Sequence, residues 1–195
     1  MPASAAPGDE DLMLAYAAGD AAAFDTLYTR HKGGVYRYLL RQCRQGGVAD
    51  ELFQDVWMNL IRARASYVPS AKFTTWLYRL AHNRLIDYYR ASGQVSLVSA
   101  DDEANADTVA ALPARARDQP ERRAENQELG ARLKDAVAAL PPVQREAFLL
   151  HQEGGLSLAE IAELTGTGVE TVKSRLRYAT NKLRTELSDL YEPSA

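Results

Sequence analysis

SLAEIAELTGTGVETVKSRLRYATNKLRTEL, from Ser157 to Leu187, has the pattern of two helices joined by a tight turn. Ser157 can cap the first helix, and Glu160, three residues later, completes a capping box. Gly166 in the turn can take the positive φ that a sharp helix end usually needs. The apolar residues of the second helix recur every three or four positions and form one stripe, which predicts a core-facing side. They are Val169, Val172, Leu176, Ala179, Leu183 and Leu187.

The second helix of this pair is also basic. Between Lys173 and Arg184 it carries five basic residues and no acidic one. Together with the capping box and the glycine turn, this charge predicts a helix-turn-helix whose second helix enters the DNA major groove. The alternative is an ordinary pair of helices with a solvated basic face.

Composition excludes several classes of protein. Cys43 is the only cysteine, which excludes an internal disulfide framework and a cysteine-based zinc site and suits the reducing cytoplasm. The three histidines share no metal-ligand spacing, so no metal is predicted, and no glycine-rich phosphate loop or nucleophile motif predicts a cofactor or an enzyme. No apolar run approaches the ~20 residues that span a membrane, and the first residues lack the features of a signal peptide.

The net charge of −3 hides an uneven distribution. Residues 1–29 carry five acidic groups and no basic one, whereas residues 30–90 carry eleven Lys or Arg against four Asp or Glu. Residues 91–120 are acidic again. A basic segment in the first half and a basic helix near the end are compatible with a nucleic-acid partner despite the overall acidity.

Four helices are predicted in the first half, because apolar residues recur there at helical spacing. The pair Gly46-Gly47 is expected to end the second of them, and Pro69 indicates a loop before the fourth. The helices cover residues 9–17, 21–40, 50–64 and 76–90, and the loop covers residues 67–75.

Two of these helices have polar faces with a possible function. The helix DELFQDVWMNLIRAR, residues 50–64, carries acid in its first turns, which either suits the helix dipole or forms a docking surface for a basic partner. The helix WLYRLAHNRLIDYYR, residues 76–90, interleaves aromatic and basic groups. Aromatic rings can stack on unpaired bases while Arg and Lys hold phosphates; the alternative is that most of these rings belong to the core.

The chain divides into three parts. Residues 93–120 lack periodicity, are rich in Ala, Asp, Ser and Pro, and are predicted to form an extended acidic linker. Helices at 121–140 and 143–152 precede the helix-turn-helix and complete a four-helix unit. We therefore predict an all-α protein with one domain at 1–92, a flexible linker at 93–120 and a second domain at 121–195.

The same order of elements resembles the extracytoplasmic-function (group IV) RNA polymerase sigma factors of the sigma-70 family. Residues 20–62 resemble the first part of the family's region 2. Residues 73–90, FTTWLYRLAHNRLIDYYR, resemble the part of region 2 that meets the −10 promoter element. Residues 140–187 resemble region 4, which reads the −35 element. The match covers nearly the whole chain.

The resemblance implies partners and roles for named residues. Asp50, Glu51, Gln54 and Asp55 would dock on the clamp coiled coil of the largest subunit of core RNA polymerase. The −10 element would be bound and melted by Lys72, Phe73, Trp76, Arg79, Asn83 and Arg84. The −35 element would be read by Thr171, Lys173, Ser174, Arg175, Arg177 and Tyr178, with the second domain on the flap of the second-largest subunit. A cytoplasmic location and an anti-sigma factor are also implied.

The sequence departs from the family pattern at three places. Glu51 and Asp55 exchange acid types around the docking Gln54, ASGQ follows Arg90 in place of a run of arginines, and Tyr178 and Thr180 alter the recognition helix. Two alternatives to a sigma factor remain at this point. One is a helix-turn-helix regulator that binds duplex DNA unaided, and the other is a module that only titrates a partner.

Overall fold

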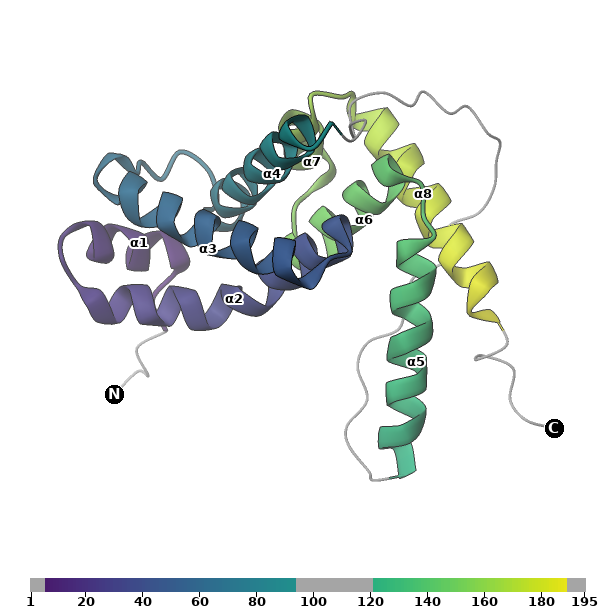
Figure 1. The fold of residues 1–195 in the computed structure, drawn as a ribbon. Coiled ribbons are helices and arrows are strands. Elements are labelled where there is room, and N and C mark those ends of the chain that lie inside the picture. The colour runs from purple at the N-terminus through teal and green to yellow at the C-terminus, as the bar shows by residue number, and fades with distance from the viewer. Residues whose placement is uncertain (1–5, 94–120, 189–195) are drawn as a thin grey trace.

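The computed structural model describes residues 6–93 and 121–188, with side chains described from residue 129 in the second range. Both ranges are helical and contain no strand, which confirms the all-α prediction (Figure 1). The helices are α1 (Asp9–Ala17), α2 (Ala21–Cys43), α3 (Gly46–Ala63), a 3-10 turn η1 (Arg64–Ser66), α4 (Phe73–Ala91), α5 (Glu121–Ala138), α6 (Pro142–Gly154), α7 (Leu158–Thr165) and α8 (Val169–Glu186). The predicted linker after Gly93 lies outside the described residues.

Helices α1 to α4 form the N-terminal domain. Asp20 caps α2, since its carboxylate accepts the backbone N–H groups of Ala22 and Ala23. The apolar stripes of α2, α3 and α4 then face one another, as their helical spacing predicts. The core contains these fully buried side chains: Leu27, Val35, Leu39, Val56, Leu60, Phe73, Leu77 and Leu85.

Two helix boundaries differ from the predictions. The glycine pair at 46–47 begins α3 and does not end the preceding helix, because Arg44 makes the turn with a left-handed φ of 60°. Helix α4 begins at Phe73, three residues before the predicted start. The carboxylate of Glu10 accepts the Phe73 N–H at 2.6 Å and satisfies a donor that the helix itself cannot pair. That cap comes from a remote segment, so local sequence does not show it.

Helices α5 to α8 form the C-terminal domain, from which α5 projects away (Figure 1). Pro142 starts α6, and Gly155 ends it with a φ of 63°. The predicted capping box between Ser157 and Glu160 is present at the start of α7, and Gly166 takes a φ of 66° in the turn to α8. The helix-turn-helix is therefore formed as the sequence predicts.

The two domains pack against each other through α2, α4, α6 and α7. Tyr78 is 2% exposed at this junction, with its ring 5.5 Å from that of Tyr38. Its hydroxyl would lie 2.8 Å from a Cβ on Gly34, and its ring 3.2 Å from one on Gly154. Among the aromatic rings of residues 76–90, for which base stacking and core packing were both open, Tyr78 belongs to the core in this arrangement. The absence of side chains on both glycines lets the three helices approach closely.

Charged and polar side chains also pair across this junction. Glu153, whose side chain is 8% exposed, accepts from Arg37 at 2.9 Å and from Arg41 at 2.6 Å. On the other side, the buried Arg145 donates to the Gln42 side chain at 3.3 Å. Since buried charges need partners, these pairs favour one particular arrangement of the domains.

Candidate nucleic-acid and protein interfaces

The helix-turn-helix presents a groove beside its basic helix. Thr171 and Lys173 are exposed on α8, while Ser174, Arg177 and Tyr178 are partly buried. An open hollow of about 510 Å³ lies between α6 and α8 and is lined by Lys173, Ser174, Arg177, Phe148, His151 and Leu158, among others. Three of the residues predicted to read the −35 element therefore share one surface.

Arg175 lies apart from that groove. It lines a second hollow, of about 450 Å³, together with Asn83 and Arg90 of α4. Arg175, predicted for the −35 element, thus lies in the same hollow as Asn83, predicted for the −10 element. The arginine at 177 lies over its neighbour Tyr178, with the guanidinium carbon 5.2 Å from the ring centroid. This cation–π contact holds the Arg177 guanidinium against the Tyr178 ring on the surface of α8.

The predicted docking residues lie on the N-terminal half of α3. Asp50, Glu51 and Gln54 are exposed, as a contact surface requires. Asp55 differs, because its Oδ2 accepts from Arg84 Nε on α4 at 2.7 Å. Arg84 was predicted for DNA binding, and in the structure it is paired with a predicted docking residue.

The residues predicted to meet the −10 element divide into exposed and buried ones. Lys72 and Asn83 are exposed, and Arg79 is partly buried. Phe73 has no exposed surface in this structure, so its ring lies in the core beneath the residues assigned to the −10 element. Trp76 is partly buried, with its ring 5.0 Å from that of Tyr67 and 6.0 Å from that of Phe73. The burial follows from the early start of α4, which turns residue 73 toward the core.

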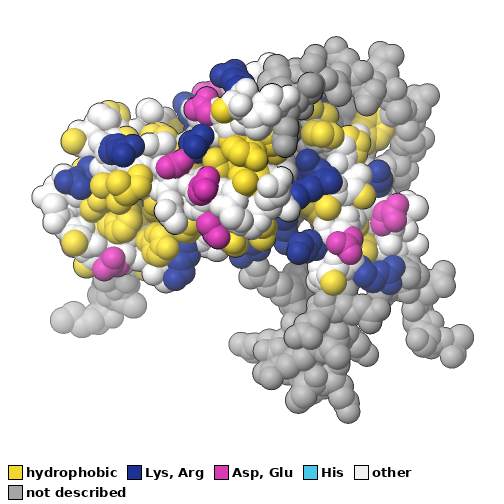
Figure 2. All heavy atoms as spheres, viewed as in Figure 1, with side chains coloured by type: hydrophobic (Ala, Val, Ile, Leu, Met, Phe, Trp, Pro, Cys, Tyr) yellow, Lys and Arg dark blue, Asp and Glu magenta, His cyan; other side chains and the backbone are white. Residues whose placement is uncertain are grey.

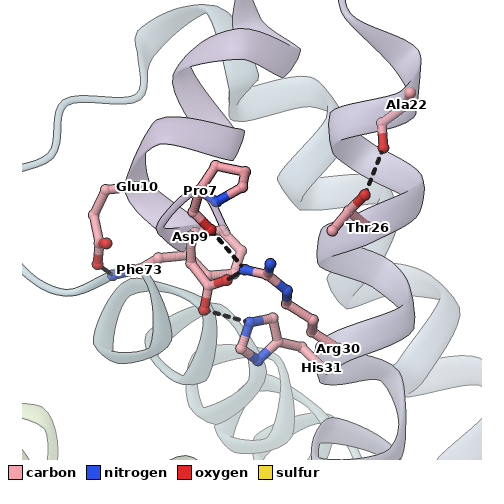
Figure 3. A network of polar contacts seen from close by, with 8 residues as sticks. All are labelled: Pro7, Asp9, Glu10, Ala22, Thr26, Arg30, His31 and Phe73. Carbon is pink, nitrogen blue, oxygen red and sulfur yellow. Dashed lines mark hydrogen bonds and ion pairs between the residues drawn. The ribbon is translucent and has the colours of Figure 1, made fainter. Parts of the chain in front are cut away.

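A network at the start of α4 includes residues that sequence reasoning missed (Figure 3). The Asp9 carboxylate lies 2.7 Å from both Arg30 and His31 of α2. Its neighbour Glu10 caps α4 at Phe73. Helix α1 therefore fixes both α2 and the loop before α4. The run of acidic residues near the N-terminus is visible in the sequence, but their partners are distant along the chain.

Three hydrogen-bond donors of α4 and the residue before it lie against α7: Lys72, Thr75 and Arg79. Glu160 Oε1 accepts from Thr75 Oγ1 at 2.7 Å, and Glu163 accepts from Arg79 at 2.7 Å. Partial burial raises the pKa of the Glu160 carboxyl, but hydrogen bonds from Ser157 and Thr75 outweigh it and lower the pKa to about 2. Glu160 is therefore a carboxylate at neutral pH.

Three further features of the described residues concern surface charge, metal ligands and membrane-spanning helices. On the face in Figure 2, basic and acidic side chains are interspersed with hydrophobic ones, and no single basic patch dominates. Among the described residues, no group of three His, Cys, Asp or Glu side chains could hold a metal ion. No helix within residues 6–93 or 121–188 has both the length and the apolarity to cross a membrane.

These features define a class: a two-domain, all-α DNA-binding protein with a helix-turn-helix at its C-terminal end. Family comparison agrees with this class. Residues 27–94 match the model of sigma-70 region 2, and residues 130–183 match that of sigma-70 region 4. The chain is 31% identical to the RNA polymerase sigma factor CarQ of Myxococcus xanthus over 88% of its own length and 93% of the relative's. It is 33% identical to the ECF sigma factor SigK of Mycobacterium tuberculosis, over 90% and 92% of the two chains.

Solved structures agree on the fold. The structure of CnrH in complex with the cytosolic domain of CnrY matches with a TM-score of 0.62, at 25% identity over 94% of this chain and 99% of that one. The RpoE sigma factor of Bartonella quintana, solved with the anti-sigma factor NepR, matches with a TM-score of 0.60, at 23% identity over 85% and 96%. The protein belongs to the extracytoplasmic-function sigma factors of the sigma-70 family, and it directs core RNA polymerase to promoters.

Proposed function

We propose that the two domains divide promoter recognition: residues 1–92 dock on core polymerase and hold the melted −10 element, and residues 121–195 read the −35 element. The formed helix-turn-helix, with Lys173, Ser174 and Arg177 on one groove, is the observation that carries this assignment. For the −10 element, Lys72, Arg79 and Asn83 are the accessible donors, while Phe73 holds the start of α4 in place. When the −10 element melts, its base pairs are replaced by stacking of the unpaired bases and by contacts of the protein with the phosphates.

Docking on the polymerase clamp is assigned to the exposed end of α3. Asp50, Glu51 and Gln54 are exposed and can meet a basic partner surface, with Asp50 also hydrogen-bonded to Tyr36, and Asp55 is oriented by Arg84. We further infer a cytoplasmic location and no covalent chemistry by the chain itself, since initiation factors of this family leave synthesis to the polymerase. Two structural relatives are described in complexes with CnrY and with the anti-sigma factor NepR, which supports a protein inhibitor for this chain too.

Run-off transcription with purified core polymerase tests this function. Transcripts are expected to start downstream of a −10 and −35 pair only when the protein is present. The alternative, a regulator that binds duplex DNA unaided, predicts nanomolar gel shifts without polymerase. Absence of any initiated transcript, with core binding intact, would instead favour a module that only titrates the polymerase.

Replacement of Lys173 by alanine is expected to weaken −35 recognition by about 1–3 kcal/mol if the ammonium reaches a base edge. The side chain is 64% exposed, so folding should be unaffected. Binding of polymerase holoenzyme to promoters with single substitutions in the −35 element measures the effect. An equal loss on every sequence would identify a phosphate contact and contradict base reading. Lys134→Ala is the matched control, because it removes the same charge from an exposed position of α5 outside this groove.

A further inference from the structure

The first turn of α4 is poorly supported by its own sequence. The helix opens with Phe73, Thr74 and Thr75, an aromatic and two β-branched residues of modest helix propensity. Its N-cap residue, Lys72, makes no side-chain cap, and the first turn contains no acidic residue to meet the positive end of the helix dipole. These local signals place the start of the helix at Trp76, whereas the structure starts it three residues earlier.

Glu10 of α1 supplies the cap that the start of α4 lacks (Figure 3). Its Oε1 accepts the backbone N–H of Phe73 at 2.6 Å, across 63 positions of the chain. A carboxylate at this place satisfies one of the unpaired donors of the helix and puts negative charge at the positive end of its dipole. A remote residue thus has the effect that a local Asp or Glu would have.

The start of α1 is itself anchored, which holds the Glu10 carboxylate in place. The neighbouring Asp9 carboxylate lies 2.7 Å from both Arg30 and His31. Arg30 also donates to the carbonyl oxygen of Pro7 at 3.1 Å. These contacts join residues 7–9 to α2, so Glu10 reaches α4 from a fixed position.

The capped turn carries residues that we assign to the −10 element. Lys72 is exposed immediately before Phe73. Trp76 follows in the next turn, with its ring 6.0 Å from that of Phe73 and 5.0 Å from that of Tyr67 in the preceding loop. If α4 began at Trp76, residues 72 and 73 would leave this geometry and the ring contacts would be lost. The placement of these −10 residues therefore depends on the hydrogen bond to Glu10.

We propose that Glu10 is a positioning residue for recognition of the −10 element: by capping α4, it fixes Lys72 and Trp76 in the arrangement that holds the melted strand. The inference rests on the proposed −10 role of α4 and adds a residue of α1 to it. Helix α1 lies before residue 27, where the match to sigma-70 region 2 begins. Glu10 acts through α4 and makes no contact with DNA in this role.

Open-complex formation by the holoenzyme tests the proposal. The probe is a promoter fragment that the wild type transcribes, with 2-aminopurine in its −10 element to report strand separation. Glu10→Ala is expected to lower open-complex formation about fivefold, because the loss of a cap shifts the equilibrium of a helix end by about that factor. Glu10→Gln keeps an oxygen that can accept the Phe73 N–H and should recover most of the loss. Asp11→Ala is the matched control, since it removes the same charge from an exposed position in the same turn of α1.

Hydrogen exchange of the free chain, followed by mass spectrometry, locates the structural change. In Glu10→Ala, peptides that span residues 73–76 should exchange about fivefold faster than in the wild type, because their helix end opens more often. Exchange in α8 should stay the same in both proteins. Asp11→Ala is expected to match the wild type in both segments.

A double-mutant cycle with Lys72 separates positioning from a general loss of stability. In the wild-type background, Lys72→Ala is expected to lower open-complex formation about threefold. In the Glu10→Ala background, the same substitution should have almost no effect, because the ammonium group is no longer held in place. General destabilisation would leave the effect of Lys72→Ala equal in both backgrounds.

Three results would overturn the proposal: Glu10→Ala forms open complexes as well as Asp11→Ala does, Glu10→Gln is as defective as Glu10→Ala, or the effect of Lys72→Ala is equal in both backgrounds. Run-off transcription by the wild type would then still support the proposed function. If Lys72→Ala leaves open-complex formation unchanged in the wild-type background, the start of α4 does not meet the −10 element. The inference then fails together with that part of the proposed function.

Discussion

Phe73→Ala is expected to lower the free energy of unfolding by about 3–5 kcal/mol, because it empties a fully buried site. The ring packs between His31 and Tyr67, with centroids 5.3 and 6.5 Å away, and against Trp76. Its loss removes these contacts and loosens the first turn of α4. Promoter melting should fail as a result, through the fold and not through a lost DNA contact. Chemical denaturation followed by circular dichroism measures the change.

Two comparison variants make this prediction specific. Phe73→Leu keeps most of the apolar volume and is expected to cost less than about 1.5 kcal/mol. Asn83→Ala, on the exposed side of α4, should change stability by no more than about 0.5 kcal/mol and still reduce open-complex formation. If Phe73→Leu remained folded but lost melting as completely as Phe73→Ala, direct contact of the ring with DNA would be the better explanation.

The double substitution Glu51→Arg and Gln54→Ala is expected to weaken binding to core polymerase by about 100-fold or more, because it places a cation against a basic partner surface. Both side chains are exposed on α3, so the fold should be retained. Binding is measured by fluorescence anisotropy of labelled protein with purified core, at several salt concentrations. The wild-type affinity should fall more steeply with salt than that of the variant.

Asp25→Arg is the matched control for this experiment, since it changes charge on an exposed position of α2. It is expected to bind core like the wild type. Asp55 is left intact on purpose, because its loss would also free Arg84 and confuse docking with DNA binding. A double variant within roughly threefold of the wild-type affinity, an effect below 1 kcal/mol, would remove this end of α3 from the docking surface.

Local sequence predicted the helices and the helix-turn-helix because their signals are short in range. The capping box of Ser157 and Glu160 and the glycine at 166 act within one turn of the chain, and both are present. The apolar spacing of α3, α4 and α8 likewise predicted the faces that pack, except at Val169, which begins α8 and is 44% exposed. The family followed from motif order, which is also a property of the sequence.

Tertiary structure decided which of the candidate site residues are accessible. Phe73 was assigned to the −10 element, yet its ring is buried against His31 and Tyr67. Tyr78, another aromatic residue of α4, is buried where the two domains meet. Asp55 accepts a hydrogen bond from Arg84, 29 positions away in the chain. Glu160 accepts one from Thr75, 85 positions away. Sequence alone determined which segments form helices, because the hydrogen bonds within a helix are local. Only the fold decided which charges and rings meet, because those partners are brought together by packing between distant segments.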